Sequence, residues 1–394
     1  MGVFLASSDD CAAQKDGLHV YDVSMMDDLA NEAHVCQSLT LVDDASNCFR
    51  QIILPLSLSY GCVKELLLAV GALYLSLDKP TAPLDYYSLA LHHKQRALHQ
   101  LRRHLTLLDI SSSDHILASM LMLCLLDITD GCQTSWSTHV SAAASLIGMG
   151  SYLSIEPSLL SFVSRFFATR DVMGRSACGN RSKFQEIAWE NPQNVDKTVG
   201  CSFELLSIIS SITDVSRQVV ENGEADNTEL IQRVATLKSQ LNNLVQLLPT
   251  TDSNPLKEES ILAQSSSLIH NAAKIYFYTA LHSARPSTYI TQTLVMEQML
   301  IISSIPSLKS AHLWSIFVTS LYACNDEQRV FFLEQFDKLE LLSATRGSTQ
   351  AAKSILQTVW KKRDLEADVN EVLDPCASDW LRFVRPMSEG LNLA

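Results

Sequence analysis

Glycine, proline and charged residues are scarce in this chain. Its 394 residues include only 13 glycines and 11 prolines, and Asp, Glu, Lys and Arg together make up 19%. Disordered and low-complexity chains need the opposite composition, so this scarcity excludes a largely unfolded protein. Hydrophobic residues make up 47% of the sequence, which is enough to build an extensive core.

Cysteine pairs at short spacing are absent. The ten cysteines are scattered along the chain, and no two of them form C-x-x-C. Cys62 and Cys124 lie inside apolar helical runs, where a free thiol behaves as a small hydrophobic group. The pattern indicates neither a disulfide framework nor a zinc site, and we expect no metal.

Neither a targeting signal nor a membrane-spanning segment is recognisable. The first residues have no basic cluster ahead of a long apolar run, and Ala6 stands where a myristoylation signal needs Ser or Thr. The longest uncharged apolar runs, at 66–77 and 116–126, are too short to cross a bilayer. We therefore expect a soluble protein of the nucleus or cytoplasm without membrane contact.

Basic residues are outnumbered, with 30 Lys and Arg against 43 Asp and Glu, and the formal charge is -13. An acidic chain repels phosphate backbones unless a local basic patch overrides the repulsion. The densest basic runs, at 94–103 and 361–363, lie in helical patterns and are interpreted as solvated helix faces. We expect no direct binding of nucleic acid.

Catalytic and cofactor motifs are also missing. Gly148 and Gly150 lack the third glycine and the preceding strand of a dinucleotide loop, and neither G-x-x-x-x-G-K-[ST] nor G-x-S-x-G occurs. Four histidines lie between 92 and 104, but without the H-E-x-x-H spacing of a zinc site. We expect no cofactor.

Helical periodicity fills most of the sequence. No alternating strand pattern is longer than a few residues, and no repeat of fixed period is present, so we predict an all-α protein built as an irregular array of packed antiparallel helices in one large domain. The expected helices cover 63–77, 85–108, 116–128, 135–147, 156–173, 203–220, 228–248, 260–284, 292–304, 313–324, 326–342 and 350–362.

The same periodicity divides the chain into three predicted segments. Residues 1–45 are acidic and weakly periodic and are predicted to be a mobile lead-in with at most one helix. Residues 46–364 form the predicted helical domain, and 365–394 are predicted to be a C-terminal tail. Within the domain, 175–200 lacks periodicity and is interpreted as a surface loop or lid.

Two distant segments carry a family signal. In the first, a leucine-rich helix containing Cys124 and Asp127 leads through Gly131 to Trp136 and a helix of small residues. The second contains Leu313-Trp314-Ser-Ile-Phe317, then Arg346-Gly347, and ends in Val359-Trp360-Lys-Lys-Arg-Asp364. Their ordered occurrence resembles the fungal-specific transcription factor domain, the regulatory region of fungal zinc-cluster transcription factors. The sequence departs from that pattern at Ser315, where Pro is usual, and at Ser348, where Asn is usual.

The resemblance implies a transcription regulator that binds a protein partner or a small apolar effector, tied to a fungal secondary-metabolite gene cluster. It also implies structural roles for Gly131, Trp314, Phe317, Arg346, Gly347 and Trp360. Family members typically begin with a six-cysteine zinc cluster that reads DNA, and the early cysteines here lack that spacing. Either a missing first exon encodes that cluster, or the protein works without contacting DNA, through a partner.

The alternative is an enzyme of natural-product biosynthesis on the same scaffold. A cofactor-independent cyclase or pericyclase, such as a Diels-Alderase, needs a shaped apolar pocket and a few hydrogen-bond donors rather than a named motif. The side chains that we expect in such an interhelical pocket, whether it takes up an effector or a substrate, are His93, Asp127, Trp136, His139 and Arg170.

Overall fold

Helices make up nearly all the regular structure of the protein, which is described here from a computed structural model. The structure describes residues 32–106, 113–132, 134–148, 155–183, 189, 191–222, 228–249, 255–368 and 380–394. Within these ranges no β-strand forms, and two isolated bridges join Asn194 to Leu247 and Val195 to Ser202. The all-α prediction is confirmed. No helix within these ranges has the length and apolar character needed to span a bilayer.

The N-terminal half runs from α2 to α8, with one π-helical turn, η1. Its elements are α2 (Glu32–Ser38), η1 (Phe49–Ile53), α3 (Leu54–Ser59), α4 (Gly61–Asp78), α5 (Tyr86–Thr106), α6 (Asp114–Thr129), α7 (Trp136–Gly148) and α8 (Pro157–Cys178).

The C-terminal half contains the remaining elements, including two 3₁₀ turns and a second π-helical turn. They are α9 (Phe203–Asn222), α10 (Thr228–Asn243), α11 (Pro255–Leu281), α12 (Tyr289–Ser304), η3 (Ser310–His312), α13 (Leu313–Ser320), α14 (Asp326–Glu340), η4 (Ser343–Thr345), α15 (Arg346–Asp368), η5 (Trp380–Val384) and α16 (Arg385–Met387).

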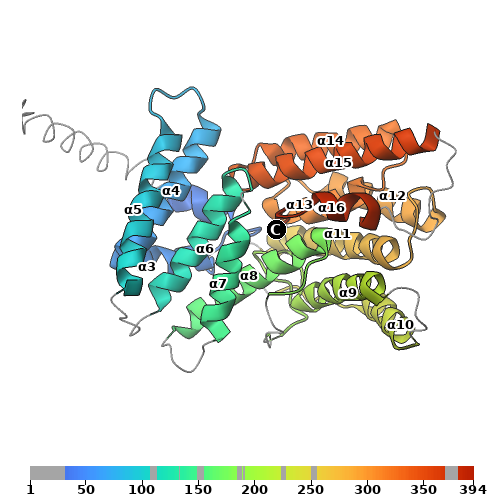
Figure 1. Ribbon diagram of the computed structural model, residues 1–394, viewed down its shortest axis with the longest axis horizontal. Helices are drawn as coiled ribbons and strands as arrows, with labels where there is room; N and C mark the ends of the chain where they lie inside the picture. Colours follow the sequence, from blue (N-terminus) through green and yellow to red (C-terminus); the bar gives the residue numbers. More distant parts are fainter. Residues whose placement is uncertain are drawn as a thin grey trace, which may run out of the picture.

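The hairpin of α4 and α5 shows how the sequence produces this packing. α4 ends one residue before Lys79-Pro80, because proline has no N–H to continue the helix. On α5, Ala90, His93, Ala97 and Leu101 are buried at spacings of three and four, so one stripe of the helix faces inward. The two helices therefore lie antiparallel along their length (Figure 1).

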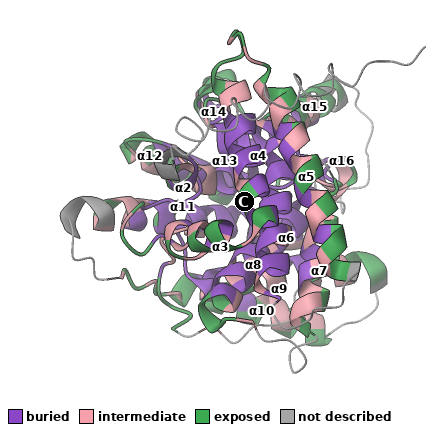
Figure 2. Ribbon diagram, turned by 90° about the vertical axis from the view of Figure 1, so that its left-hand side faces the viewer, coloured by how far each residue is buried: buried purple, intermediate pink, exposed green. Residues whose placement is uncertain are grey.

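Two large hydrophobic clusters make up most of the core, beside a small third one around Leu262, and α8 belongs to both of the large ones. Phe162 and Phe166 pack in the cluster of the N-terminal half, whereas Met173 and Ala177 pack in that of the C-terminal half. In Figure 1 the early helices lie on the left and α9 to α15 on the right, with the C-terminus between them. Figure 2 shows buried residues concentrated along the inner helices, α8 included. α8 thus contributes to both clusters and connects them.

Gly174 does not end α8, although we predicted a break there. The helix continues to Cys178 and stops at Gly179, whose φ of 74° is the left-handed conformation that commonly ends helices. A β-carbon on Gly174 would lie 3.1 Å from the ring of Trp136, so this glycine makes room for an indole rather than for a turn.

Both flanks of the expected domain pack onto it. Val35 and Leu39, from within the predicted lead-in, join the N-terminal cluster, and the buried Trp380, Phe383 and Leu393, from the predicted tail, join the C-terminal cluster. Their apolar side chains gain from burial, and the packed part of the chain therefore extends beyond 46–364. Residues 1–31 and 369–379 lie outside the described residues.

Candidate functional site

The two motif segments meet at two glycines. A β-carbon on Gly347, in the first turn of α15, would lie 2.7 Å from the Cα of Gly131, which follows α6 with a φ of 72°. Only a residue without a side chain permits this approach. Beside it, Arg346 donates hydrogen bonds to the carbonyl oxygens of Glu340, at 2.8 Å, and Leu77, at 2.7 Å.

The motif aromatics are buried and hold helices together. The indole of Trp314 donates a hydrogen bond of 2.8 Å to the hydroxyl of Ser176, and that of Trp360 donates one of 3.0 Å to the carbonyl of Ser320. Phe317 is fully buried in the C-terminal cluster. Buried indoles commonly satisfy their N–H in this way.

Trp136 anchors the C-terminal segment to the N-terminal half. Its indole N–H donates a hydrogen bond of 2.8 Å to the carbonyl oxygen of Gly390, and its ring packs against Gly174. The side chain is 6% exposed. Trp136 therefore joins the two halves and does not line the main cavity described below.

His93 belongs to a buried ion-pair group between α4 and α5. Its Nδ1 lies 2.7 Å from a carboxylate oxygen of Glu65, whose other oxygen accepts from Arg96 at 2.8 Å. Both His93 and Glu65 are buried. Arg96 belongs to a basic run that we interpreted as a solvated helix face. Its side chain is 42% exposed, and from that face it reaches the buried carboxylate of Glu65.

Asp127 is the centre of a second closed group, between α5, α6 and α7. It accepts from Lys94 at 2.7 Å and Ser135 at 2.5 Å, and His139 lies 3.1 Å away. Burial alone raises the pKa of this carboxyl, but the hydrogen bonds from His139, Lys94 and Ser135 outweigh burial and lower the pKa to about 2. The structure therefore brings together Asp127 and His139 of the expected pocket residues, and the group has no room for a ligand between its members.

Arg170, on α8, has a different environment. Its guanidinium carbon lies 3.5 Å over the ring of Phe166, and its buried Nε has no hydrogen-bond partner. Among the described residues no carboxylate pairs with it. Burial lowers its pKa to about 10, because the surrounding interior disfavours the charged form. Arg170 is half-buried, with its Nε fully shielded from solvent. A poorly solvated cation without a counter-ion is costly, and such residues concentrate at binding sites.

Arg170 lines a cavity of about 760 Å³. The wall consists of α8, Ile147 of α7, Trp189, residues between 191 and 203, and short stretches near Ser46 and Pro249. Its aromatic residues are Phe162, Phe166, Trp189 and Phe203. The size and the mixed polar and aromatic lining are those of a small-molecule site.

The other charged side chains of this cavity are paired. Arg165 lies 3.3 Å from Asp196, and Lys197 is bonded to Asp44. Asp196 also accepts from the backbone N–H groups of Thr198 and Val199, which holds the loop in shape. Arg170 is therefore the charge in this lining that the described residues leave unbalanced.

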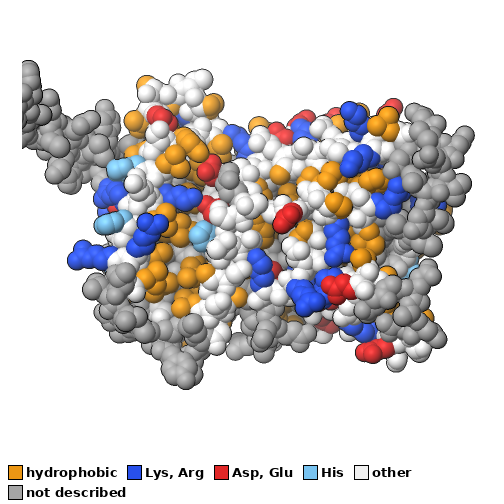
Figure 3. All heavy atoms as spheres, in the orientation of Figure 1, with side chains coloured by type: hydrophobic (Ala, Val, Ile, Leu, Met, Phe, Trp, Pro, Cys, Tyr) orange, Lys and Arg blue, Asp and Glu red, His pale blue; other side chains and the backbone are white. Residues whose placement is uncertain are grey.

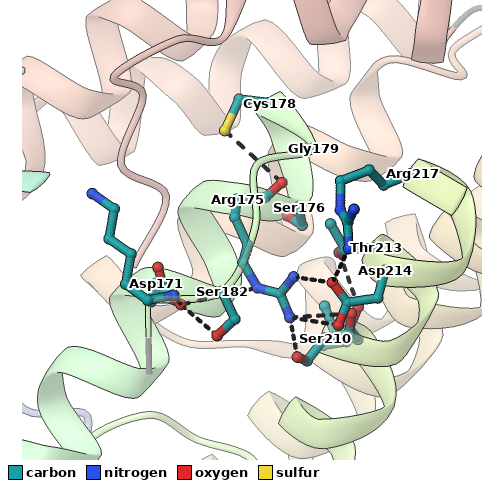
Figure 4. Close-up of polar contacts among 12 residues, drawn as sticks. Asp171, Arg175, Ser176, Cys178, Gly179, Ser182, Ser210, Thr213, Asp214 and Arg217 are labelled. Carbon is teal, nitrogen blue, oxygen red and sulfur yellow. Dashed lines mark hydrogen bonds and ion pairs between the residues drawn. The ribbon is translucent and has the colours of Figure 1, made fainter. Parts of the chain in front are cut away.

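A second group on α8, which the sequence reading missed, faces α9 (Figure 4). Arg175 is 3% exposed and donates to a carboxylate oxygen of Asp214 at 2.9 Å and to Ser210. Asp171 accepts from Ser182 and from the backbone of Lys183, each at 3.0 Å. The spacing of four between Asp171 and Arg175 was the available signal, since such pairs share a helix face.

This group borders a smaller cavity of about 390 Å³, which is separated from the main one by a shared aromatic wall. Trp189 and Phe203 line both cavities and stack with ring centroids 4.0 Å apart. Trp189 falls inside the predicted loop at 175–200, so part of that loop forms the wall of the site. Sequence reasoning missed it because an isolated loop tryptophan has no periodic partner.

Surface charge and metal-ligand geometry complete the description of the site. On the face shown in Figure 3, basic and acidic side chains are interspersed. Within the ranges that the structure describes, no three His, Cys, Asp or Glu side chains gather as a metal site would need. The charged side chains that line the cavity are Arg165, Arg170, Lys197 and Asp196.

Comparison with known proteins identifies the family. The family model for the fungal specific transcription factor domain matches residues 32–394. A relative in Neurospora crassa, the acriflavine sensitivity control protein acr-2, is 25% identical over 375 residues, which cover 84% of this chain and 61% of that protein. No solved structure matches the chain. The chain belongs to the family of the fungal specific transcription factor domain.

Proposed function

We propose that this chain is the regulatory domain of a fungal transcription regulator, and that the cavity beside α8 takes up a small effector. The family match and the likeness to acr-2 support the regulatory part. The observation that carries the effector part is the 760 Å³ cavity with aromatic walls and an unpaired Arg170. The regulated genes belong to a secondary-metabolite cluster, and the protein acts on them in the nucleus, with a partner protein.

The position of α8 supplies a route from effector to regulation. The helix lines the cavity along Ser161 to Arg170 and packs into both hydrophobic clusters. A ligand that contacts α8 changes how this helix packs in the two clusters. Packed interiors shift between discrete arrangements rather than deform continuously. The exposed surface that a partner protein binds on either half then changes.

Deleting the gene tests the regulatory part. Transcripts of the neighbouring genes and the metabolites that they produce are measured in one culture of the deletion strain. A collapse of the neighbouring transcripts is the expected result. Unchanged transcripts with one accumulating intermediate would contradict regulation and favour the second candidate.

The second candidate is a natural-product cyclase or pericyclase. The observation that favours it is the lining itself, in which four aromatic side chains share the cavity with a guanidinium whose Nε has no hydrogen-bond partner. Such a pocket holds an apolar substrate in a reactive shape. Purified protein incubated with the accumulating intermediate must then convert it, whereas a regulator leaves it unchanged.

A pair of matched variants tests the cavity separately. Ser161→Trp places a large ring at an exposed lining position of α8, whereas Ser303→Trp places the same ring on an exposed turn of α12. In cells we expect Ser161→Trp to abolish induction of the neighbouring genes and Ser303→Trp to leave it intact, at equal protein levels. Equal induction by both variants would contradict an effector in this cavity.

A further inference from the structure

Among the described residues that line the cavity beside α8, Arg170 is the charged side chain without a counter-ion, and the orientation of its guanidinium limits how a ligand can reach it. The ring of Phe166 covers one face of the Arg170 guanidinium at 3.5 Å. Donors of a guanidinium lie in its plane, so a ligand reaches them along the edge and not through the covered face. The partner that fits is flat at its charged end and accepts two hydrogen bonds side by side.

We propose that this cavity binds an aromatic monocarboxylate, with the carboxylate on Arg170 and the ring among the aromatic side chains of the wall. The proposal rests on the proposed function only in treating this ligand as the effector.

Charge balance selects a carboxylate rather than a phosphate. Arg165 and Lys197 are neutralised by Asp196 and Asp44, so one positive charge remains at Arg170. A carboxylate brings one negative charge. A phosphate monoester carries about −1.5 to −2 at neutral pH, which leaves excess negative charge in a half-enclosed site beside Asp196.

The wall selects an aromatic body. Phe162, Trp189 and Phe203 line the same cavity, and Trp189 already stacks on Phe203 with an interplanar angle of 14°. Aromatic rings prefer offset-stacked or edge contacts with one another, so a flat ring gains more here than a branched aliphatic chain. The volume of about 760 Å³ accepts a bicyclic ring with its carboxylate.

Calorimetry on the purified full chain tests the proposal with three probes of one ring system. The probes are 2-naphthoate, the neutral 2-naphthamide and the dianionic 2-naphthyl phosphate. We expect 2-naphthoate to bind one to one and at least about tenfold more tightly than either of the others, since a hydrogen-bonded charge pair is worth that much. Equal affinities for acid and amide, tighter binding of the phosphate, or no binding of the acid would each overturn the proposal.

Variants locate the carboxylate. Arg170→Gln is expected to reduce the affinity for 2-naphthoate to that for the amide, while the affinity for the amide stays unchanged. Arg181→Gln is the matched control, because Arg181 lies outside this cavity and its side chain is 79% exposed. If Arg170→Gln binds the acid as the unaltered chain does, the carboxylate is not on Arg170. The probe comparison on the unaltered chain decides the matter if the variant does not fold.

Failure of this inference differs from failure of the proposed function. Loss of neighbouring transcripts on gene deletion without binding of 2-naphthoate leaves the regulator standing and overturns the ligand class. Binding of 2-naphthoate with unchanged transcripts supports the ligand class and contradicts the regulator.

Discussion

Asp127 and Arg170 are charged side chains inside the same helical half, and they differ in how their charge is balanced. Both act electrostatically on the thiol of Cys124, so they lie in one neighbourhood. Asp127 has partners in Lys94, Ser135 and His139, whereas among the described residues Arg170 contacts the ring of Phe166 and borders a cavity. A closed polar group stabilises a fold, and an open one is available to a ligand.

The largest expected effect on stability comes from removing the carboxylate of Asp127, whose charge is paired. Asp127→Ala leaves Lys94 and His139 without their shared acceptor, and we expect the free energy of unfolding to fall by about 3 kcal/mol. Urea denaturation measures it. Asp337→Ala is the control, because Asp337 is 65% exposed and its pair with Lys353 contributes at most about 1 kcal/mol. Similar losses for both variants would show that Asp127 is no more than a surface charge.

The pH dependence of stability gives a second test of the paired charge of Asp127. The pKa of Asp127 lies at about 2, below its ordinary 3.8, so its stabilising effect is complete above pH 4 and is lost as the pH falls through 2. We expect this residue to contribute about 2 kcal/mol of the loss over that window. Unfolding followed at several pH values should show a shallower fall for Asp127→Ala. Identical slopes for the variant and the unaltered chain would contradict the paired carboxylate.

Replacing Arg170 should change the free energy of unfolding in the opposite direction. Arg170→Met removes an unpaired charge from the interior and keeps an unbranched apolar stem over Phe166, so we expect the free energy of unfolding to rise by about 1 kcal/mol. Thermal unfolding of the two proteins without added ligand measures the change. A loss of stability instead would mean that Arg170 holds the fold together as Asp127 does.

The smallest effect is expected at the edge of the closed group. Ser135→Ala removes one donor from Asp127 but leaves Lys94 and His139 in place, and Ser135 is exposed. We expect a loss of about 0.5 kcal/mol in the free energy of unfolding by urea. A loss as large as that of Asp127→Ala would show that the hydroxyl, and not the ammonium, dominates the group.

Much of the fold was predictable because helices are local. The end of α4 lies where Pro80 predicted it, since proline acts on its own neighbours. The helix break predicted at Gly174 was wrong because this glycine serves a tertiary contact. Its missing side chain serves the ring of Trp136, from another helix, and nothing within α8 signals that contact.

The candidate site was predictable only in its residue types. Asp127, His139 and Arg170 were all expected in a pocket, yet two of them close on each other and one faces a cavity. Spacing on one helix gives the side on which a side chain lies, but the partner comes from elsewhere. Lys94 reaches Asp127 across 33 residues of sequence.

The sequence by itself determined the all-α class, the order of the helices and the family, because apolar periodicity and short motifs are local properties of the chain. Only the tertiary structure decided that Gly131 contacts Gly347 and that the charge of Asp127 is paired with that of Lys94. It also decided that Arg170 lies over Phe166 without a paired carboxylate among the described residues. Those outcomes depend on which helix faces lie against one another. Packing between distant segments sets that arrangement, and the burial it produces determines the free energy of each charge.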